Sequence, residues 1–491
     1  MAYPQQMGLP STLDYKMPPS LGQGCRSTSV SISPDGITQV TSAAFPSPAF
    51  VANSTFAQAS FGGGQQISFT IPSGQGRNQF LSPWDTTLSF SVSYTPSVAS
   101  SVTGGNLNLV GSAASFFESL TLYSNNVPIE QIGSYGALQN YLLQNTVSLS
   151  ERLGGISVAM GTDNSNASNG HEYATATTSL VTYNYCIPLC SIIGYNSDRL
   201  IPIGSLSNLQ LQMTIASGNF PFVSFCSAVA TGGTLGALTL NNFFLNMKYV
   251  TLDDMSSAML NQTLQDGKWF VRATTYTQSS VSLPNGSAGA QQLLLQIRNS
   301  SVRSILAYFF TTASTAVCPN GQYDAIGILT NSRQLQVGSA YYPNRPINDL
   351  QRPAEGYCYL IQALSGVASP VKALGSTVSR ESYNSHFAAV PAGSDSTIVV
   401  PGATAMIRPA ASGSDIGSQN LRQFPNAHYH GYDLEVVNST LLSGINTRAS
   451  PPFVNLNIAT ATSVVMNLVA WGMSDVVLAF DVNSQTVQAF I

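Results

Sequence analysis

The residues whose spacing most resembles a reactive or metal-binding site are two histidines in the last quarter of the chain. His428 and His430 form the segment His-Tyr-His, and on a strand their side chains would point to the same face. Asp433 follows closely, and imidazole together with carboxylate is a ligand set that binds transition metals. The chain has only 4 histidines, however, and no third ligand stands at a clear spacing. We therefore interpret both as ordinary loop histidines and predict no metal site.

Carboxylates offer a second kind of chemistry, because positioned acids can transfer protons. Asp253 and Asp254 are adjacent, while Glu118 and Glu130 stand alone. The aspartate pair opens a segment with helical spacing, so a helix cap is its better interpretation. We expect the two glutamates at rim or interface positions.

Motifs for nucleophilic catalysis and phosphate binding are missing from the sequence. No Gly-x-Ser-x-Gly motif lies between a strand and a helix, and the run Gly62–Gly64 is not followed by Lys and Ser or Thr. Sequons at Asn53, Asn261 and Asn438 are expected by chance in a chain so rich in Ser, Thr and Asn. We therefore predict no catalytic residue, no cofactor and no enzymatic activity.

The elements that position these residues must be built with very few charges. Only 8% of the 491 residues are Asp, Glu, Lys or Arg, whereas soluble domains carry roughly 25%. Coiled coils and charged helical bundles need Glu and Lys on their solvent faces, so this composition excludes them. A net charge of −4 with 44% hydrophobic residues excludes a disordered chain. The sequence has no basic arm or stripe, so we expect no direct binding of nucleic acid.

The cysteines and the first residues indicate synthesis in a reducing compartment. The 6 cysteines follow no disulfide framework, and Cys186 and Cys190 lack further ligands for zinc, so we expect free thiols. The first residues include neither the basic nor the apolar region of a signal peptide. The uncharged segment 456–474 is rich in Thr, Ser and Asn and lacks cationic flanks. We predict two buried strands there instead of a membrane span.

Alternation of apolar and polar residues predicts many short strands. In the first half they are expected at 66–71, 87–94, 116–123, 179–187, 209–215 and 238–252. In the second half they are expected at 269–278, 291–297, 302–311, 333–337, 432–437, 453–458 and 463–480. Helical spacing is found at 133–146, at 355–364 and in a linking segment at 253–268. The pattern predicts an all-β protein of two sandwiches with short inserted helices.

The two halves of the chain repeat one pattern. Segment 119–131 holds a strand, a polar turn and Val127-Pro128, and it leads to a helix that contains Tyr-Leu-Leu-Gln. Segment 332–349 holds a strand, a polar turn and Tyr342-Pro343, and it leads to a helix that contains Tyr-Leu-Ile-Gln. The identity is low, but the order and spacing agree over most of the chain. We predict two tandem copies of one β-sandwich.

These features resemble the double jelly-roll major capsid proteins of adenovirus-like and tectivirus-like viruses. Segment 334–366, QLQVGSAYYPNRPIND followed by EGYCYLIQALSG, looks like the strand–Pro–helix part of the second jelly roll in the virophage and polinton-like branch. Segment 439–458 is similar to a turn and strand late in that roll.

The resemblance spans residues 50–491 and implies a domain organisation. Two tandem eight-stranded jelly rolls would lie at 51–252 and 269–491, with an extended N-terminal arm at 1–50 and a linker helix at 253–268.

The resemblance also implies a structural role. The chain would be a major capsid protein whose homotrimers form pseudo-hexameric capsomers of an icosahedral virus shell. Its partners would be neighbouring capsomers, the penton and minor capsid proteins, and an internal membrane beneath the shell is compatible with it. The protein would reside in the virion after synthesis in the host cytoplasm or nucleus. The alternative is a tandem β-sandwich that binds carbohydrate or a receptor, as spikes and adhesins do.

Overall fold

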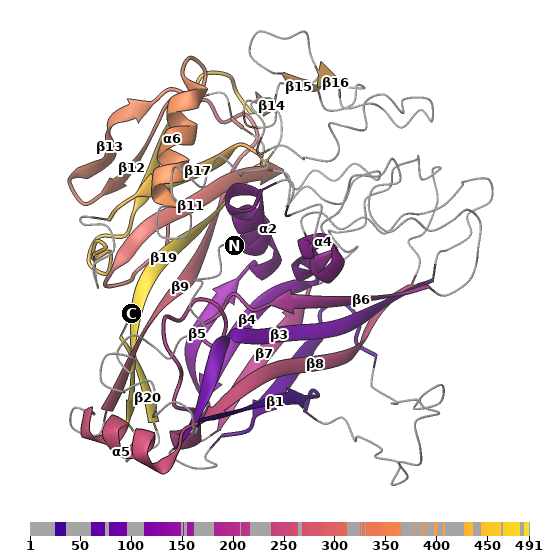
Figure 1. The fold of residues 1–491 in the computed structure, drawn as a ribbon. Coiled ribbons are helices and arrows are strands. Elements are labelled where there is room, and N and C mark those ends of the chain that lie inside the picture. The colour runs from indigo at the N-terminus through magenta and orange to yellow at the C-terminus, as the bar shows by residue number, and fades with distance from the viewer. Residues whose placement is uncertain are drawn as a thin grey trace.

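The structure is a computed structural model that describes most of the chain. The residues described are 25–35, 60–73, 78–95, 112–148, 151, 155–161, 181–206, 208–216, 237–263, 268–311, 325, 327–328, 330–364, 378, 383, 386–387, 397–399, 406–407, 427–435, 443–462, 465–481 and 486–490. Nearly all the regular structure in these ranges is antiparallel sheet, arranged as two sandwiches (Figure 1).

The first sandwich consists of two four-stranded sheets. One sheet has the order β1 (Arg26–Ile32), β8 (Ala237–Thr251), β3 (Gln79–Thr95) and β6 (Val181–Pro188). The other has the order β2 (Gln66–Ile71), β7 (Leu209–Ile215), β4 (Phe117–Ser124) and β5 (Val127–Gly133). Burial alternates along β7, where every second side chain points into the core, because successive side chains of a strand face opposite sides.

The second sandwich is built in the same way. One sheet contains β9 (Lys268–Leu283), β19 (Met466–Asp481), β11 (Val302–Thr311) and β17 (Tyr429–Asp433), with β20 (Thr486–Phe490) also paired to β19. The other has the order β10 (Gly289–Leu294), β18 (Phe453–Ile458), β12 (Thr330–Val337) and β13 (Ala340–Ile347). A small separate sheet is formed by β14 (His386–Phe387), β15 (Thr397–Val399) and β16 (Met406–Ile407).

Both sandwiches have the jelly-roll topology. In each one, the first, eighth, third and sixth strands form one sheet, and the second, seventh, fourth and fifth form the other, when β14 to β16 and β20 are set aside. The predicted fold class of two tandem jelly rolls is therefore confirmed. We call them roll 1, from β1 to β8, and roll 2, from β9 to β20.

Helices occupy corresponding places in the two rolls. In each roll the fifth strand is followed by a helix, α2 (Tyr135–Thr146) after β5 and α6 (Pro353–Ala363) after β13. Helix α5 (Asp254–Thr263) lies between the rolls in sequence, and the backbone N–H of Ser256 donates to Asp253 Oδ1 at 2.8 Å, the helix cap expected of this aspartate. Shorter helices are α4 (Gly155–Met160), η2 (Ala113–Phe116) and η3 (Ile203–Ser205).

The predicted turn and the uncharged segment both have the structure expected from the sequence. The predicted turn Pro284-Asn-Gly286 joins β9 to β10, and Gly286 has a φ of 81°, a left-handed conformation that glycine adopts readily. Segment 456–474 contains parts of two strands, β18 and β19, as predicted. Across the ranges that the structure describes, no helix is long and apolar enough to cross a bilayer.

The range expected to form an N-terminal arm contains a strand of the sandwich. Arg26–Ile32 forms β1 and pairs along its whole length with β8, so this part of 1–50 belongs to roll 1. The remaining residues of that range, apart from 25 and 33–35, lie outside the described residues. Four cysteines lie in described positions, and all are free thiols, as expected: Cys25, Cys186, Cys190 and Cys358.

Candidate functional site

The contact between the two rolls is centred on α2, which roll 1 presents to the β9–β19 side of roll 2 (Figure 1). The Tyr141 hydroxyl donates to the backbone carbonyl of His430 at 2.8 Å. In the opposite direction, the Tyr429 hydroxyl donates to Gln144 Oε1 at 2.9 Å. Residues 135 to 145 of α2 are all buried, including polar side chains such as Asn140. We call this contact, formed by α2 and β5 against roll 2, the inter-roll seam.

Aromatic rings fill the seam around Tyr141. Its ring packs edge-on against Tyr429 with 4.6 Å between centroids, and it also contacts Tyr308 and Trp471. The indole N–H of Trp471 donates to the carbonyl of Gly133 at 3.1 Å. Such ring pairs add stabilisation beyond the apolar area that they bury. The seam is therefore packed like a protein interior, and several of its polar atoms are hydrogen-bonded from one roll to the other.

Glu130 lies in the same seam and is fully enclosed. Its carboxylate accepts hydrogen bonds from the Ser191 hydroxyl, from the Ile192 N–H at 2.9 Å and from the Thr275 hydroxyl of β9 at 3.3 Å. Burial raises the pKa of Glu130 to about 7, although the three hydrogen bonds act in the opposite direction. The expected interface position of Glu130 thus lies between the two rolls of one chain. Glu118, by contrast, is exposed on β4.

In roll 2, the outer face of the corresponding helix, α6, is open to solvent in the single chain. The shared helix motif places Tyr359 at the position of Tyr141, and Gln362 at the position of Gln144. Tyr359 is only half-buried and Gln362 is exposed, whereas their counterparts in α2 are buried. Cys358, the counterpart of the buried Asn140, is exposed as well.

Strand β13 and the loop after it add large apolar groups to this exposed area. Most side chains of β13 are exposed or half-buried, and Tyr341 keeps 42% of its surface accessible. Leu350, between β13 and α6, keeps 36%. We call these residues together the α6–β13 surface: Tyr341, Leu350, Cys358, Tyr359 and Gln362. Large apolar side chains that stay exposed are compatible with an interaction surface.

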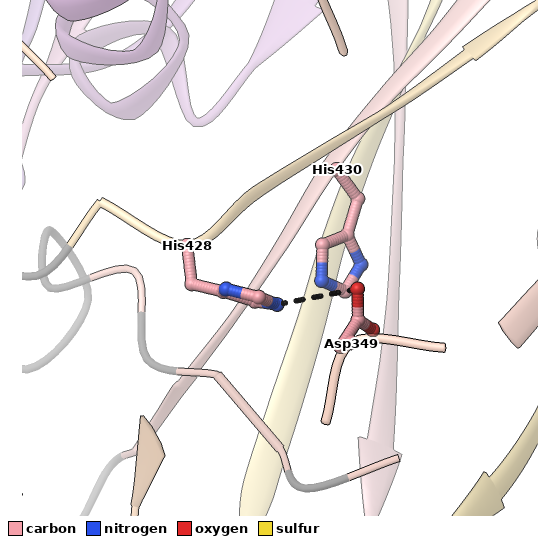
Figure 2. A group of neighbouring side chains, drawn as sticks. All are labelled: Asp349, His428 and His430. Atoms are coloured by element: carbon pink, nitrogen blue, oxygen red, sulfur yellow. Dashed lines mark ion pairs between the residues drawn. The ribbon is translucent and has the colours of Figure 1, made fainter. Parts of the chain in front are cut away.

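A second candidate site lies inside roll 2, where His428 and His430 approach Asp349 (Figure 2). One ligand atom from each residue lies within 4.8 Å of the others, and all three side chains are buried. Both histidines are buried; His428 lies in the loop before β17, as expected, whereas His430 belongs to β17, so the expected loop position is wrong for His430 alone. The third ligand that the spacing lacked comes from Asp349, at a distant position in the sequence. We call this group the Asp349 cluster.

Arg333 holds the carboxylate of this cluster in place. Its Nε donates to Asp349 Oδ2 at 2.7 Å, and its guanidinium lies over the ring of Tyr432 at 5.8 Å. Burial by itself would raise the pKa of Asp349, but the charge of Arg333 and the neighbouring histidines lower it well below its usual range. Arg333 takes an inward position on β12, like Leu335 and Val337. A charged residue at an inward position of an alternating strand is the signal that the sequence analysis missed.

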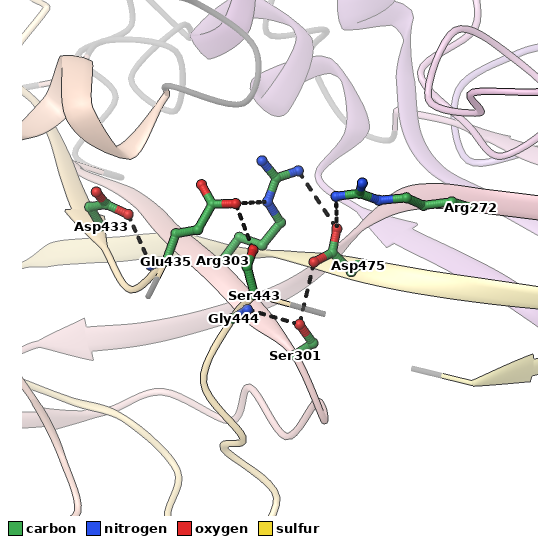
Figure 3. Close-up of polar contacts among 8 residues, drawn as sticks. All are labelled: Arg272, Ser301, Arg303, Asp433, Glu435, Ser443, Gly444 and Asp475. Atoms are coloured by element: carbon green, nitrogen blue, oxygen red, sulfur yellow. Dashed lines mark hydrogen bonds and ion pairs between the residues drawn. The ribbon is translucent and has the colours of Figure 1, made fainter. Parts of the chain in front are cut away.

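Asp433, the residue first considered as a third ligand, belongs to another network (Figure 3). Its Oδ1 accepts the backbone N–H of Glu435 at 3.0 Å. Glu435 pairs with Arg303 Nε at 3.2 Å, and Arg303 and Arg272 both approach the fully buried Asp475, at 3.7 and 3.4 Å. Charges of opposite sign thus compensate one another inside roll 2, as buried ionic groups must.

The remaining residues singled out from the sequence have local roles or lie outside the described ranges. Gly62 and Gly64 form a turn before β2, in which the Gly62 N–H donates to Gln65 Oε1 at 2.9 Å. Asn261 lies in α5, while Asn53 and Asn438 are outside the residues described.

Comparisons with known proteins relate this architecture to virus shells. No protein-family model and no curated protein sequence matches the chain. Among solved structures, the capsid of the virus PBCV-1 matches with a TM-score of 0.51 and 12% identity, over 95% of this chain and 97% of that one. The Faustovirus major capsid protein matches with 0.51 and 8%, over 92% and 90%.

A structure of the Sputnik virophage matches with a TM-score of 0.50 and 12% identity, over 91% of this chain and 92% of that chain. Similarity at this level of identity is similarity of fold. The chain therefore has the double jelly-roll fold found in these capsid proteins.

Proposed function

We propose that this chain is the major capsid protein of an icosahedral virus, and that three copies form a pseudo-hexameric capsomer. The single observation that carries the proposal is the relation between the inter-roll seam and the α6–β13 surface. The outer face of α2, which roll 1 buries against roll 2, has an exposed or half-buried counterpart on α6 of roll 2. A second copy of the chain offers a roll 1 that can take the corresponding place.

Symmetry explains why three chains would complete the assembly. A contact between roll 1 and roll 2 that is repeated from chain to chain is a head-to-tail contact, and such contacts form closed rings when the rotation fits. Three chains supply six rolls in alternating order. Each α6–β13 surface would then be covered by roll 1 of the next chain, and no roll would keep an unpartnered face.

The composition supports a shell protein in contact with copies of itself. Charged residues are depleted at the centres of protein interfaces because their desolvation costs free energy. A charged fraction of 8% is suited to a subunit whose sides face neighbours. With 18 basic against 22 acidic residues, the chain has no excess of positive charge for holding a genome.

The remaining parts of the proposal concern partners and location. The capsomers would contact one another, the penton and minor capsid proteins in the virion, and an internal membrane could lie beneath the shell. We also propose that the part of 1–50 outside β1 serves as an arm between neighbouring subunits, that 253–268 links the rolls, and that the protein is not an enzyme.

The test is the mass and outline of the purified full-length protein. We expect the mass of three chains by light scattering and a hexagonal outline in electron micrographs. A stable monomer that binds glycans would contradict the proposal and favour the tandem carbohydrate-binding or receptor-binding alternative.

A further inference from the structure

The Asp349 cluster has no part in the assembly proposed above, and its geometry leaves one carboxylate oxygen unused. Asp349 Oδ2 accepts hydrogen bonds from Arg333 Nε at 2.7 Å and from the Thr330 hydroxyl at 2.8 Å. Asp349 Oδ1 is buried and has no hydrogen-bond donor among the residues that the structure describes. It lies 3.9 Å from His428 Nε2. A buried carboxylate oxygen that accepts no hydrogen bond is costly, so a cation bound at this position would be favourable.

The hydrogen bond made by His428 Nδ1 determines whether Nε2, the other ring nitrogen, can bind a metal ion. His428 Nδ1 lies 2.6 Å from the backbone carbonyl oxygen of Tyr383. A carbonyl only accepts hydrogen bonds, so Nδ1 carries a proton, and Nε2, which faces Asp349, is the ring nitrogen through which His428 would bind a metal ion. Histidines that bind metals are commonly held in this way, with the second ring nitrogen donating to a carbonyl.

His430 completes the group from the same strand segment. Its ring lies 5.0 Å from that of His428, at 84° to it, and one ligand atom of each of the three residues falls within 4.8 Å of the others. Figure 2 shows both histidine rings converging on the carboxylate of Asp349. The three side chains are buried, which separates this group from the acidic surface clusters that occur without a metal.

From this arrangement we propose that the Asp349 cluster binds one divalent transition-metal ion, Zn²⁺ in the first instance. The ligands are His428 Nε2, a ring nitrogen of His430 and Asp349 Oδ1, with the remaining position left to water. Two imidazoles and one carboxylate suit Zn²⁺, whereas Ca²⁺ and Mg²⁺ prefer sets of oxygen ligands. Arg333 and Thr330 hold the other carboxylate oxygen and so orient Asp349 toward the ion.

The position of the ion gives it a structural role. Asp349 follows β13 in one sheet of roll 2, while His430 belongs to β17 in the opposing sheet. Helix α6 packs over the group, because a side chain at Gly356 would meet Arg333 Nη2 at 2.6 Å and Asp349 Oδ1 at 3.2 Å. A bound ion would therefore join the two sheets directly beneath the α6–β13 surface, and its binding free energy would stabilise the folded roll.

The experiment measures zinc binding by the full-length chain carrying Cys358→Ser, so that the exposed thiol does not contribute. The protein is stripped with EDTA, reloaded with ZnCl₂ and dialysed, and we expect elemental analysis to find one Zn²⁺ bound per chain. Excess ZnCl₂ should raise the melting temperature by about 3 °C or more. Co²⁺ in place of Zn²⁺ should give the strong visible absorption of a low-coordinate ion. His430→Gln and Asp349→Asn should each weaken Zn²⁺ binding at least about 10-fold.

Asp433→Asn is the matched control, since Asp433 is close in sequence but belongs to the other network; it should bind Zn²⁺ as the parent does. Asp349→Asn leaves Arg333 buried without its partner and could prevent folding, in which case His430→Gln and the Co²⁺ spectrum decide. The proposal is overturned if the parent binds no stoichiometric Zn²⁺, if Co²⁺ shows only the spectrum of the hydrated ion, or if His430→Gln binds as tightly as Asp433→Asn.

Discussion

Two buried carboxylates in this protein have their pKa values shifted in opposite directions. Glu130 and Asp349 are both removed from water, and burial alone raises the pKa of each. Glu130 is surrounded by neutral donors, so its pKa rises to about 7. Asp349 lies against the guanidinium of Arg333, which lowers its pKa well below the usual range. The neighbouring charge, and not the depth of burial, decides the direction.

The shift of Glu130 predicts a pH dependence of stability. The folded chain holds a proton on Glu130 up to about pH 7, whereas the unfolded chain loses it near the ordinary glutamate pKa of 4.5. The contribution of Glu130 to the free energy of unfolding therefore falls as the pH rises from about 4.5 to about 7, and is constant above that range. Glu130→Gln should remove this fall. Urea unfolding of the wild type and of this variant at pH 5 and pH 8 measures the change in the free energy of unfolding.

The control for this prediction is Glu151→Gln, which changes an exposed carboxylate outside the seam. This variant should keep the pH dependence of the wild type. Equal pH dependence in the wild type and in Glu130→Gln would show that Glu130 does not carry the effect.

At the scale of elements, α2 and α6 show how one motif can have two environments. The two helices follow corresponding strands and share the Tyr-Leu-Leu/Ile-Gln motif. Both apolar positions of the motif face the core in each roll, as Leu142 and Leu360 illustrate. The outer positions differ: Gln144 is buried in the inter-roll seam, while Gln362 is exposed. In the proposed trimer, Gln362 would be buried by the next chain, as Gln144 is buried within one chain.

This comparison predicts the effect of a charge placed on the outer face of α6. Gln362→Arg should leave the folded monomer intact, because the side chain is exposed there, but should weaken the trimer by burying an unpaired charge. We expect a shift from trimer to monomer by light scattering with an unchanged circular dichroism spectrum.

Gln292→Arg serves as the matched control. Gln292 is exposed on β10, at the opposite edge of the same sheet from β13, and this variant should remain trimeric. If both variants stay trimeric to the same extent, α6 does not lie in the subunit interface.

Strands β1, β5 and β13, which the sequence analysis did not predict, all lie at an edge of their sheet. Strand β1 has mostly exposed side chains, so its sequence lacks a hydrophobic alternation. Strands β5 and β13 contain prolines, which interior strands avoid because proline cannot donate to the ladder. Both lie at an edge of their sheet, where proline is tolerated. These segments form strands because each pairs with a neighbouring strand, and only the folded chain brings that neighbour beside it.

At the scale of the whole molecule, the low charge predicts how the assembly responds to salt. The contacts described in the inter-roll seam are rings and hydrogen bonds of neutral groups, apart from Glu130. If the contact between chains repeats them, the trimer should persist at high NaCl concentration, since salt screens charges and strengthens apolar burial. Light scattering at about 0.1 M and about 1 M NaCl tests this, and dissociation at high salt would contradict it.

The sequence by itself determined the fold class, the repeat and the positions of most strands. These depend on local patterns: the alternation of Gln66–Ile71 or Leu209–Ile215, the turn at Gly286 and the helix cap at Asp253. Each pattern is written in neighbouring residues, so it can be recognised without knowledge of the rest of the chain.

Only the tertiary structure decided which distant residues share a site. It placed Asp349 and Arg333 beside His428 and His430, and it separated Asp433 from them although Asp433 is closer in sequence. Jelly-roll topology brings strands together that are far apart along the chain, so the spacing of ligands in the sequence carries no information about their distance in space. The same topology buried both faces of α2 and left the outer face of α6 exposed, a difference that the motif shared by both helices could not reveal.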